Sequence, residues 1–99
     1  MRLDRRTREI IKGEVSRRLG EGAVVRLFGS RVVDSLRGGD IDLLVETDAV
    51  IPNRAETLCQ LHGALTLTLG DRKLDILLKD ARTADAPIFE IAKRTGVLL

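Results

Sequence analysis

The chain of 99 residues is poor in several residue types: it has one cysteine, two prolines, two phenylalanines, and no tryptophan or tyrosine. A single cysteine excludes an internal disulfide, which is typical of proteins in a reducing compartment, so we expect a cytoplasmic location. The core has to be built from leucine, isoleucine and valine. No apolar run approaches the ~18 residues needed to span a membrane, and no apolar stretch of the signal-peptide kind follows the charged N-terminal residues. We therefore expect no membrane association.

The net charge of the chain is also small. The formal net charge is +2 and the sequence pI is about 9.1, which is too mild to predict nucleic-acid binding by itself. The first 20 residues hold seven Lys or Arg against three acidic residues. A solvated helix face is the simpler interpretation of this run, and a basic surface for RNA or an acidic partner is the alternative. Nucleic acid is therefore not required as a partner.

Length and composition predict one globular domain over residues 1–99. Hydrophobic residues make up 43% and charged residues 32% of the chain, as in ordinary globular domains. A chain of this length can build one core and not two. Little of it remains for a separate module that binds a large substrate. If the protein acts on something large, we expect a partner to supply the rest of the site, in a homo- or hetero-oligomer.

Hydrophobic periodicity alternates between helical and strand patterns along the chain. The predicted elements, in chain order, are a helix at residues 4–19, a strand at 23–28, a short helix at 30–36, a strand at 40–46, a helix that begins near Pro52 or Asn53, a strand at 73–79 and a helix that begins at 85–87 and ends at Gly96. This order predicts an α/β (α+β) fold, in which helices pack against a small mixed sheet of three or more strands.

The ends of the two later helices have competing signals. Thr66-Leu67-Thr68 would also suit a strand, so the third helix has an open end between residues 62 and 69. Asp85 is the predicted N-cap of the last helix, with Pro87 in its first turn. We expect the final Val97-Leu98-Leu99 to be a last strand or part of the core, and a partner interface is the alternative.

The segment Asp40-Ile41-Asp42 opens the second predicted strand. Alternate side chains of a strand share a face, so Asp40 and Asp42 point the same way. Two carboxylates this close repel each other unless a cation lies between them, and carboxylate oxygens suit Mg²⁺ or Mn²⁺. Taken alone, the pair would more simply be a solvated strand start.

Gly29-Ser30 directly follows the first predicted strand. A glycine at a strand-to-helix turn lets the backbone approach a ligand, and the free N–H groups at a helix start attract phosphate. The Ser30 hydroxyl adds a donor, and Arg31 could add a further contact. A plain turn with an N-cap is the simpler interpretation of these residues alone.

Asp75 lies inside the apolar strand Leu74-Asp75-Ile76-Leu77-Leu78. A charge in such a strand is unfavourable unless it reaches water, a partner or a metal ion. Asp75 is therefore either a carboxylate at the mouth of the sheet or a third ligand of the same site.

These signals occur in one order: a strand, Gly-Ser, a short helix, Asp-x-Asp on a strand, and a lone Asp on a later strand. Leu27-Phe28-Gly29-Ser30-Arg31, followed by Asp40-Ile41-Asp42-Leu43-Leu44-Val45, resembles the signature of the polymerase-β-like nucleotidyltransferase superfamily. From about residue 4 to its end the chain is similar to the minimal nucleotidyltransferases (MNT) of prokaryotes.

The resemblance implies a role for each matching residue. Gly29 and Ser30, with Arg31 beside them, would hold the phosphates of ATP. Asp40, Asp42 and Asp75 would bind two divalent ions, Mg²⁺ or Mn²⁺, and carry the catalysis. The implied reaction is transfer of AMP from ATP to a hydroxyl, with release of pyrophosphate.

The resemblance also implies a partner. MNT proteins often accompany a HEPN toxin, a helical RNase, and act as its antitoxin, in some cases by transferring AMP to a toxin tyrosine. We therefore expect a protein adenylyltransferase of a type VII-like toxin–antitoxin pair. The alternatives are an antitoxin that acts by binding alone and an enzyme that modifies a small molecule.

Two further residues receive no functional role. His62, on the third predicted helix, is interpreted as a surface or packing residue. Cys59 is predicted to be a small buried hydrophobic residue.

Overall fold

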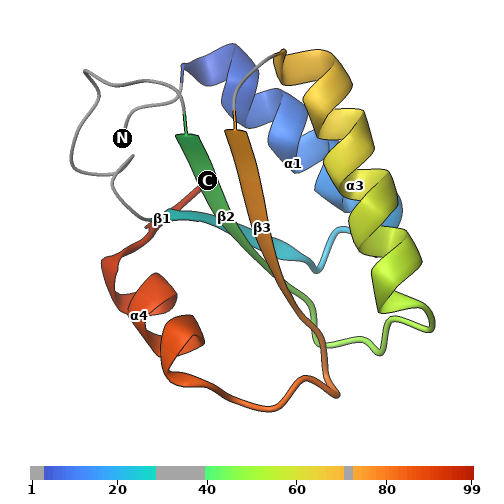
Figure 1. The fold of residues 1–99 in the computed structure, drawn as a ribbon, viewed down its shortest axis with the longest axis vertical. Helices are drawn as coiled ribbons and strands as arrows, with labels where there is room; N and C mark the ends of the chain where they lie inside the picture. The colour runs from blue at the N-terminus through green and yellow to red at the C-terminus, as the bar shows by residue number, and fades with distance from the viewer. Residues whose placement is uncertain (1–3, 29–39, 71–72) are drawn as a thin grey trace.

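The computed structural model describes residues 4–28, 40–70 and 73–99 (Figure 1). The elements are α1 (Arg5–Leu19), β1 (Val24–Phe28), β2 (Asp40–Glu46), α3 (Arg54–Leu69), β3 (Lys73–Lys79), α4 (Pro87–Thr95) and β4 (Val97–Leu98). Three helices thus pack on one four-stranded sheet within the described residues, which confirms the predicted α+β fold. The short helix predicted at residues 30–36 lies outside them.

The sheet is mixed, with the strand order β3-β2-β1-β4. β1 runs antiparallel to both of its neighbours, β2 and β4. β2 and β3 run parallel, and α3 is the crossover between them, as parallel neighbours require. β2 therefore lies in the middle of the sheet, between the strand that precedes Gly29 and the strand that carries Asp75.

Strand alternation divides the sheet into two faces. On one face, Ile41, Leu43 and Val45 of β2 are fully buried in the main core, which α1 and α3 cover through Ile11 and Leu61. On the other face, a smaller core forms around Leu44 of β2 with Phe89 and Ala92 of α4. Figure 1 shows α1 and α3 side by side, with α4 on the other side of the sheet.

Local signals explain where α1 and α3 begin and end. Asp4 caps α1, because its Oδ1 accepts a hydrogen bond from the Thr7 N–H at 2.7 Å. Asn53 caps α3 in the same way, through the Glu56 N–H. α3 continues to Leu69 and ends at Gly70, whose φ of 84° suits glycine. The strand considered for Thr66-Leu67-Thr68 is therefore wrong, since these residues are the last turn of α3.

The C-terminal part contains a second correction. α4 begins with Pro87 in its first turn, as predicted, but its N-cap is Ala86, which makes no side-chain capping bond. The predicted cap, Asp85, instead forms an ion pair with Lys79 at 3.6 Å. The last residues form β4, and Leu99 is buried, so the expected final strand is confirmed.

Cys59 provides a third correction, because its side chain is exposed on α3 rather than buried. His62 is also on the exposed side of α3, where its Nε2 lies 3.0 Å from the Leu74 carbonyl oxygen of β3. Among the described helices, none has the length and apolar character needed to cross a membrane.

Candidate functional site

The register of β2 and β3 brings two of the predicted carboxylates level with each other. Asp42 and Asp75 are Cα partners in this parallel pair. Neighbouring strands lie ~4.8 Å apart, and side chains of paired residues project from the same face. Because Ile41 and Leu43 point into the main core, Asp42 and Asp75 project from the opposite face, the one on which α4 packs.

The last residue of β1, which precedes the predicted phosphate-binding residues in the sequence, lies next to Asp42. Phe28, the last residue of β1, is the Cα partner of Asp42. Gly29, Ser30 and Arg31 follow Phe28 in the sequence and lie outside the described residues. The chain thus leaves β1 at the level of the carboxylates.

The surroundings of Asp75 explain how an apolar strand can contain it. Leu74 is buried in the main core, whereas 57% of the Asp75 side chain is exposed. Its Oδ2 lies 4.0 Å from Nζ of Lys73, at the first position of β3. The carboxylate therefore reaches both water and a cation, and the unfavourable burial considered from the sequence does not occur.

The donor atoms at this point suit a hard divalent ion. Asp42 is half-buried and Asp75 is exposed, so the pair is partly shielded at β2 and open to solvent at β3. Carboxylate oxygens are the ligands that Mg²⁺ and Mn²⁺ favour. Asp40 lies two residues before Asp42 on β2, and its side chain is outside the described part. Among the side chains that are described, no three of His, Cys, Asp or Glu are close enough together to hold a metal ion.

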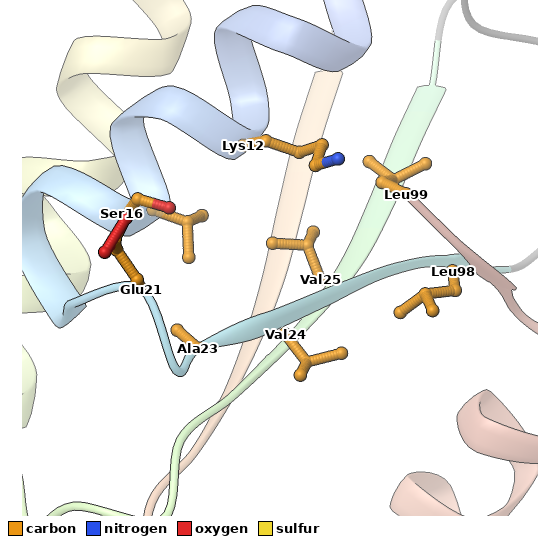
Figure 2. Close-up of a pocket in the computed structure, with 9 residues that line it drawn as sticks. Lys12, Ser16, Glu21, Ala23, Val24, Val25, Leu98 and Leu99 are labelled. Atoms are coloured by element: carbon orange, nitrogen blue, oxygen red, sulfur yellow. The ribbon is translucent and has the colours of Figure 1, made fainter.

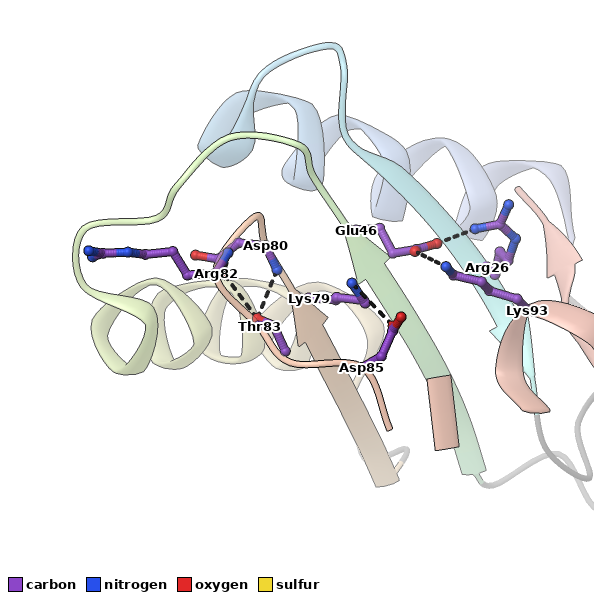
Figure 3. A network of polar contacts seen from close by, with 8 residues as sticks. All are labelled: Arg26, Glu46, Lys79, Asp80, Arg82, Thr83, Asp85 and Lys93. Carbon is purple, nitrogen blue, oxygen red and sulfur yellow. Dashed lines mark hydrogen bonds and ion pairs between the residues drawn. The ribbon is translucent and has the colours of Figure 1, made fainter. Parts of the chain in front are cut away.

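Further along the same face, the charged side chains are used to hold the fold (Figure 3). Glu46, at the end of β2, pairs with Arg26 of β1 and, at 3.2 Å, with Lys93 of α4. Lys79 pairs with Asp85 and lies 5.8 Å from the centre of the Phe89 ring. These pairs tie α4 and the loop before it to the ends of β2 and β3 that are opposite Asp42 and Asp75.

Asp80 is a buried carboxylate that the sequence interpretation missed. It follows β3 directly and is 2% exposed. Its Oδ2 accepts a hydrogen bond from the Ile51 N–H at 2.9 Å, and its Oδ1 accepts bonds from the Arg82 N–H and the Thr83 hydroxyl. The bond from Ile51 is the main cause of its lowered pKa. Asp80 thus joins the loop before α3 to the loop after β3.

The sequence signal for this turn is an Asp followed three residues later by Thr. Such side chains hydrogen-bond to the backbone of the turn that contains them. Figure 3 shows Thr83 in contact with Asp80. Asp80 follows the last residue of β3, whereas Asp75 lies near the first. Asp80 is therefore a structural residue of the loops and not a member of the candidate site.

Two of the clefts among the described residues bear on the position of the site. One, of about 210 Å³, lies between α1, β1 and the C-terminal residues, and it contains none of the predicted site residues (Figure 2). The other, of about 460 Å³, follows β3 and is lined mainly by apolar side chains such as Leu58, Ile76 and Phe89. Leu77 also lines this cleft and lies two residues after Asp75, on the same face of β3, so an apolar surface adjoins Asp75 on the β3 side.

Comparison with known families identifies the domain in which these residues lie. A family model described as the nucleotidyltransferase domain matches residues 8–95. This range contains every predicted site residue, from Gly29 to Asp75. No curated protein matches the chain.

Proposed function

Because the chain belongs to the family of nucleotidyltransferase domains, we propose that it transfers AMP from ATP to a hydroxyl of an acceptor protein, with the help of divalent ions. The observation that carries this proposal is the register of β2 and β3, which sets Asp42 level with Asp75. Asp42 is also level with Phe28, after which Gly29 and Ser30 follow. Carboxylates and a phosphate-binding turn at one end of a sheet are the parts that this reaction needs.

Asp40, Asp42 and Asp75 would hold Mg²⁺ or Mn²⁺, and Gly29, Ser30 and Arg31 would contact the phosphates. A divalent ion bound there would stabilise negative charge on the attacking and leaving oxygens. In the reaction, the acceptor oxygen bonds to the α-phosphorus, and the bond from that phosphorus to the bridging oxygen of the β-phosphate breaks. Pyrophosphate leaves, and the hydroxyl proton is released.

The strand order supports a division of the site into two sides. β1 and β3 flank β2 on opposite sides, so Phe28 at the end of β1 and Asp75 of β3 lie on either side of Asp42. In this arrangement the triphosphate binds on the β1 side and the acceptor hydroxyl approaches on the β3 side. Attack from the side opposite the leaving group is the geometry of an in-line displacement.

The acceptor that we propose is a tyrosine of a HEPN toxin, with this chain as its antitoxin. Support comes from the apolar cleft along β3, on the acceptor side, which suits an aromatic ring or the side chains that flank it. The described residues form a sheet and its covering helices, and nothing among them resembles a separate acceptor-binding module. A partner that brings its own hydroxyl to the β3 side would complete the site.

A labelling experiment with the product of a neighbouring gene tests this proposal. The chain, the candidate partner and Mg²⁺ are incubated with ATP labelled either at the α- or at the γ-phosphate. We expect the partner to acquire the α label and not the γ label, and Asp42→Asn to abolish the transfer. Asp85→Asn is the matched control, because Asp85 is an exposed aspartate on the loop before α4.

Other results would change the assignment in defined ways. A tight complex without label would favour an antitoxin that acts by contact alone. Transfer of the γ label would replace nucleotidyl transfer with phosphoryl transfer. Full activity of Asp42→Asn would remove Asp42 from the site.

A further inference from the structure

Lys73 is a charged residue of the candidate site that the sequence interpretation did not use. It is the first residue of β3, two positions before Asp75, and it is the Cα partner of Asp40. Its Nζ lies 4.0 Å from Oδ2 of Asp75, and 70% of its side chain is exposed. An ammonium group is thus present beside a carboxylate predicted to bind a divalent ion.

We propose that Lys73 is a positioning residue that pairs with Asp75 until a divalent ion binds, and that it thereby sets the ion affinity of the site. The inference rests on the proposed function, because it takes Asp75 as an ion ligand. In the ion-free protein, Lys73 offsets the repulsion between the level carboxylates of Asp42 and Asp75. A divalent ion competes with the ammonium group for the same carboxylate, so the ion pair weakens ion binding.

The other lysine of β3 is already engaged elsewhere. Lys79 projects from the same face but pairs with Asp85 at 3.6 Å and lies against the Phe89 ring. Only 19% of its side chain is exposed, compared with 70% for Lys73. Lys73 is therefore the lysine of this strand that can leave its partner without disturbing the packing of α4.

The size of the effect follows from the exposure of the pair. Exposed ion pairs change an equilibrium by about 1.5-fold to 5-fold, because water and salt screen them. Removing the ammonium group should therefore strengthen Mn²⁺ binding by about that factor at low ionic strength. In ~1 M salt the Debye length falls to about 3 Å, so the difference should largely disappear.

The test is a Mn²⁺ titration of the isotope-labelled protein, followed by paramagnetic broadening of the backbone amide signals of β2 and β3. We expect Lys73→Met to bind Mn²⁺ about 1.5-fold to 5-fold more tightly than the wild type, and Lys73→Arg, which keeps the charge, to match the wild type. Lys12→Met is the control, since Lys12 is an exposed lysine of α1. In an Asp75→Asn background, Lys73→Met should have no further effect.

Two results would overturn this role for Lys73. One is Mn²⁺ affinity in Lys73→Met that equals or falls below that of the wild type, and the other is an equal gain in Lys12→Met. Failure of the proposed function looks different: no amide signal of the wild type near Asp42 or Asp75 would broaden at all, and the inference would fall with it.

Discussion

Replacement of Gly96 by alanine should destabilise the protein through a close backbone contact. Gly96 has φ −80° and ψ 164°, which any residue adopts, so its conformation does not require glycine. The lack of space at this position requires glycine, because a Cβ atom would overlap the carbonyl oxygen of Ala92 and lie 3.1 Å from the carbonyl oxygen of Leu27. Gly96 joins α4 to β4, so the overlap falls where α4 meets the sheet.

The expected loss of stability has two parts. Relief of the overlap requires residue 96 to move away from the Ala92 carbonyl in the last turn of α4, and forcing extra atoms into a packed region costs ~1–3 kcal/mol. The same movement weakens the 2.8 Å hydrogen bond from the Gly96 N–H to the Ala92 carbonyl, worth ~0.5–1.5 kcal/mol. Together these predict a loss of about 2–4 kcal/mol, which for a chain of this size lowers Tm by about 10–25 °C.

The measurement is thermal and urea unfolding of Gly96→Ala beside Gly63→Ala. Gly63 lies inside α3, and a Cβ atom there would meet nothing within 4 Å. Since alanine is the better helix former by ~0.5–1 kcal/mol, Gly63→Ala should raise Tm by a few degrees. If Gly96→Ala unfolds within a few degrees of the wild type, the close contact between α4 and β1 is not a constraint on this position.

Three further predictions concern the core and the loops. The pKa of Asp80 is lowered from 3.8, so its stabilising effect is present above that pH and is lost as the pH falls through the folded-state value. The free energy of unfolding should therefore fall less steeply with decreasing pH in Asp80→Asn than in the wild type, and equal slopes in the two proteins would contradict this role of Asp80. Leu44 is fully buried, so Leu44→Ala should lower the free energy of unfolding by ~2–5 kcal/mol in urea titrations. Cys59 is exposed and should react with a thiol reagent in the folded protein as fast as in the unfolded chain, whereas slow modification in the folded protein would contradict its placement.

The strands and most helix limits could be predicted from local sequence patterns. β2 and β3 have the predicted limits because turn residues flank two short apolar runs. The error at Asp85 has a tertiary cause, since Lys79 competes for its carboxylate. The error at Cys59 could have been avoided. Cys59 precedes the buried Leu61 by two residues, and this spacing corresponds to about 200° of helix rotation, so Cys59 lies on the opposite side of α3.

The candidate site was less accessible from the sequence. Alternation along β2 places Asp40 and Asp42 on one face. The alignment of Asp75 with Asp42, however, depends on the register of two parallel strands, which the packing of α3 sets. The same register brings Lys73 level with Asp40, and no pattern in the sequence indicated this. The hydrogen bond from the Ile51 N–H to Asp80 joins residues 29 positions apart and also depends on the tertiary fold.

The central claim is that Asp42 belongs to an ion-dependent nucleotide site, and calorimetric measurement of ATP binding tests it most directly. The isolated chain should bind ATP in the presence of Mg²⁺ or Mn²⁺ and lose this binding when the ion is removed by EDTA. Asp42→Asn should not bind ATP under either condition, whereas Asp85→Asn should behave as the wild type. ATP binding by Asp42→Asn that equals the wild type would contradict the account.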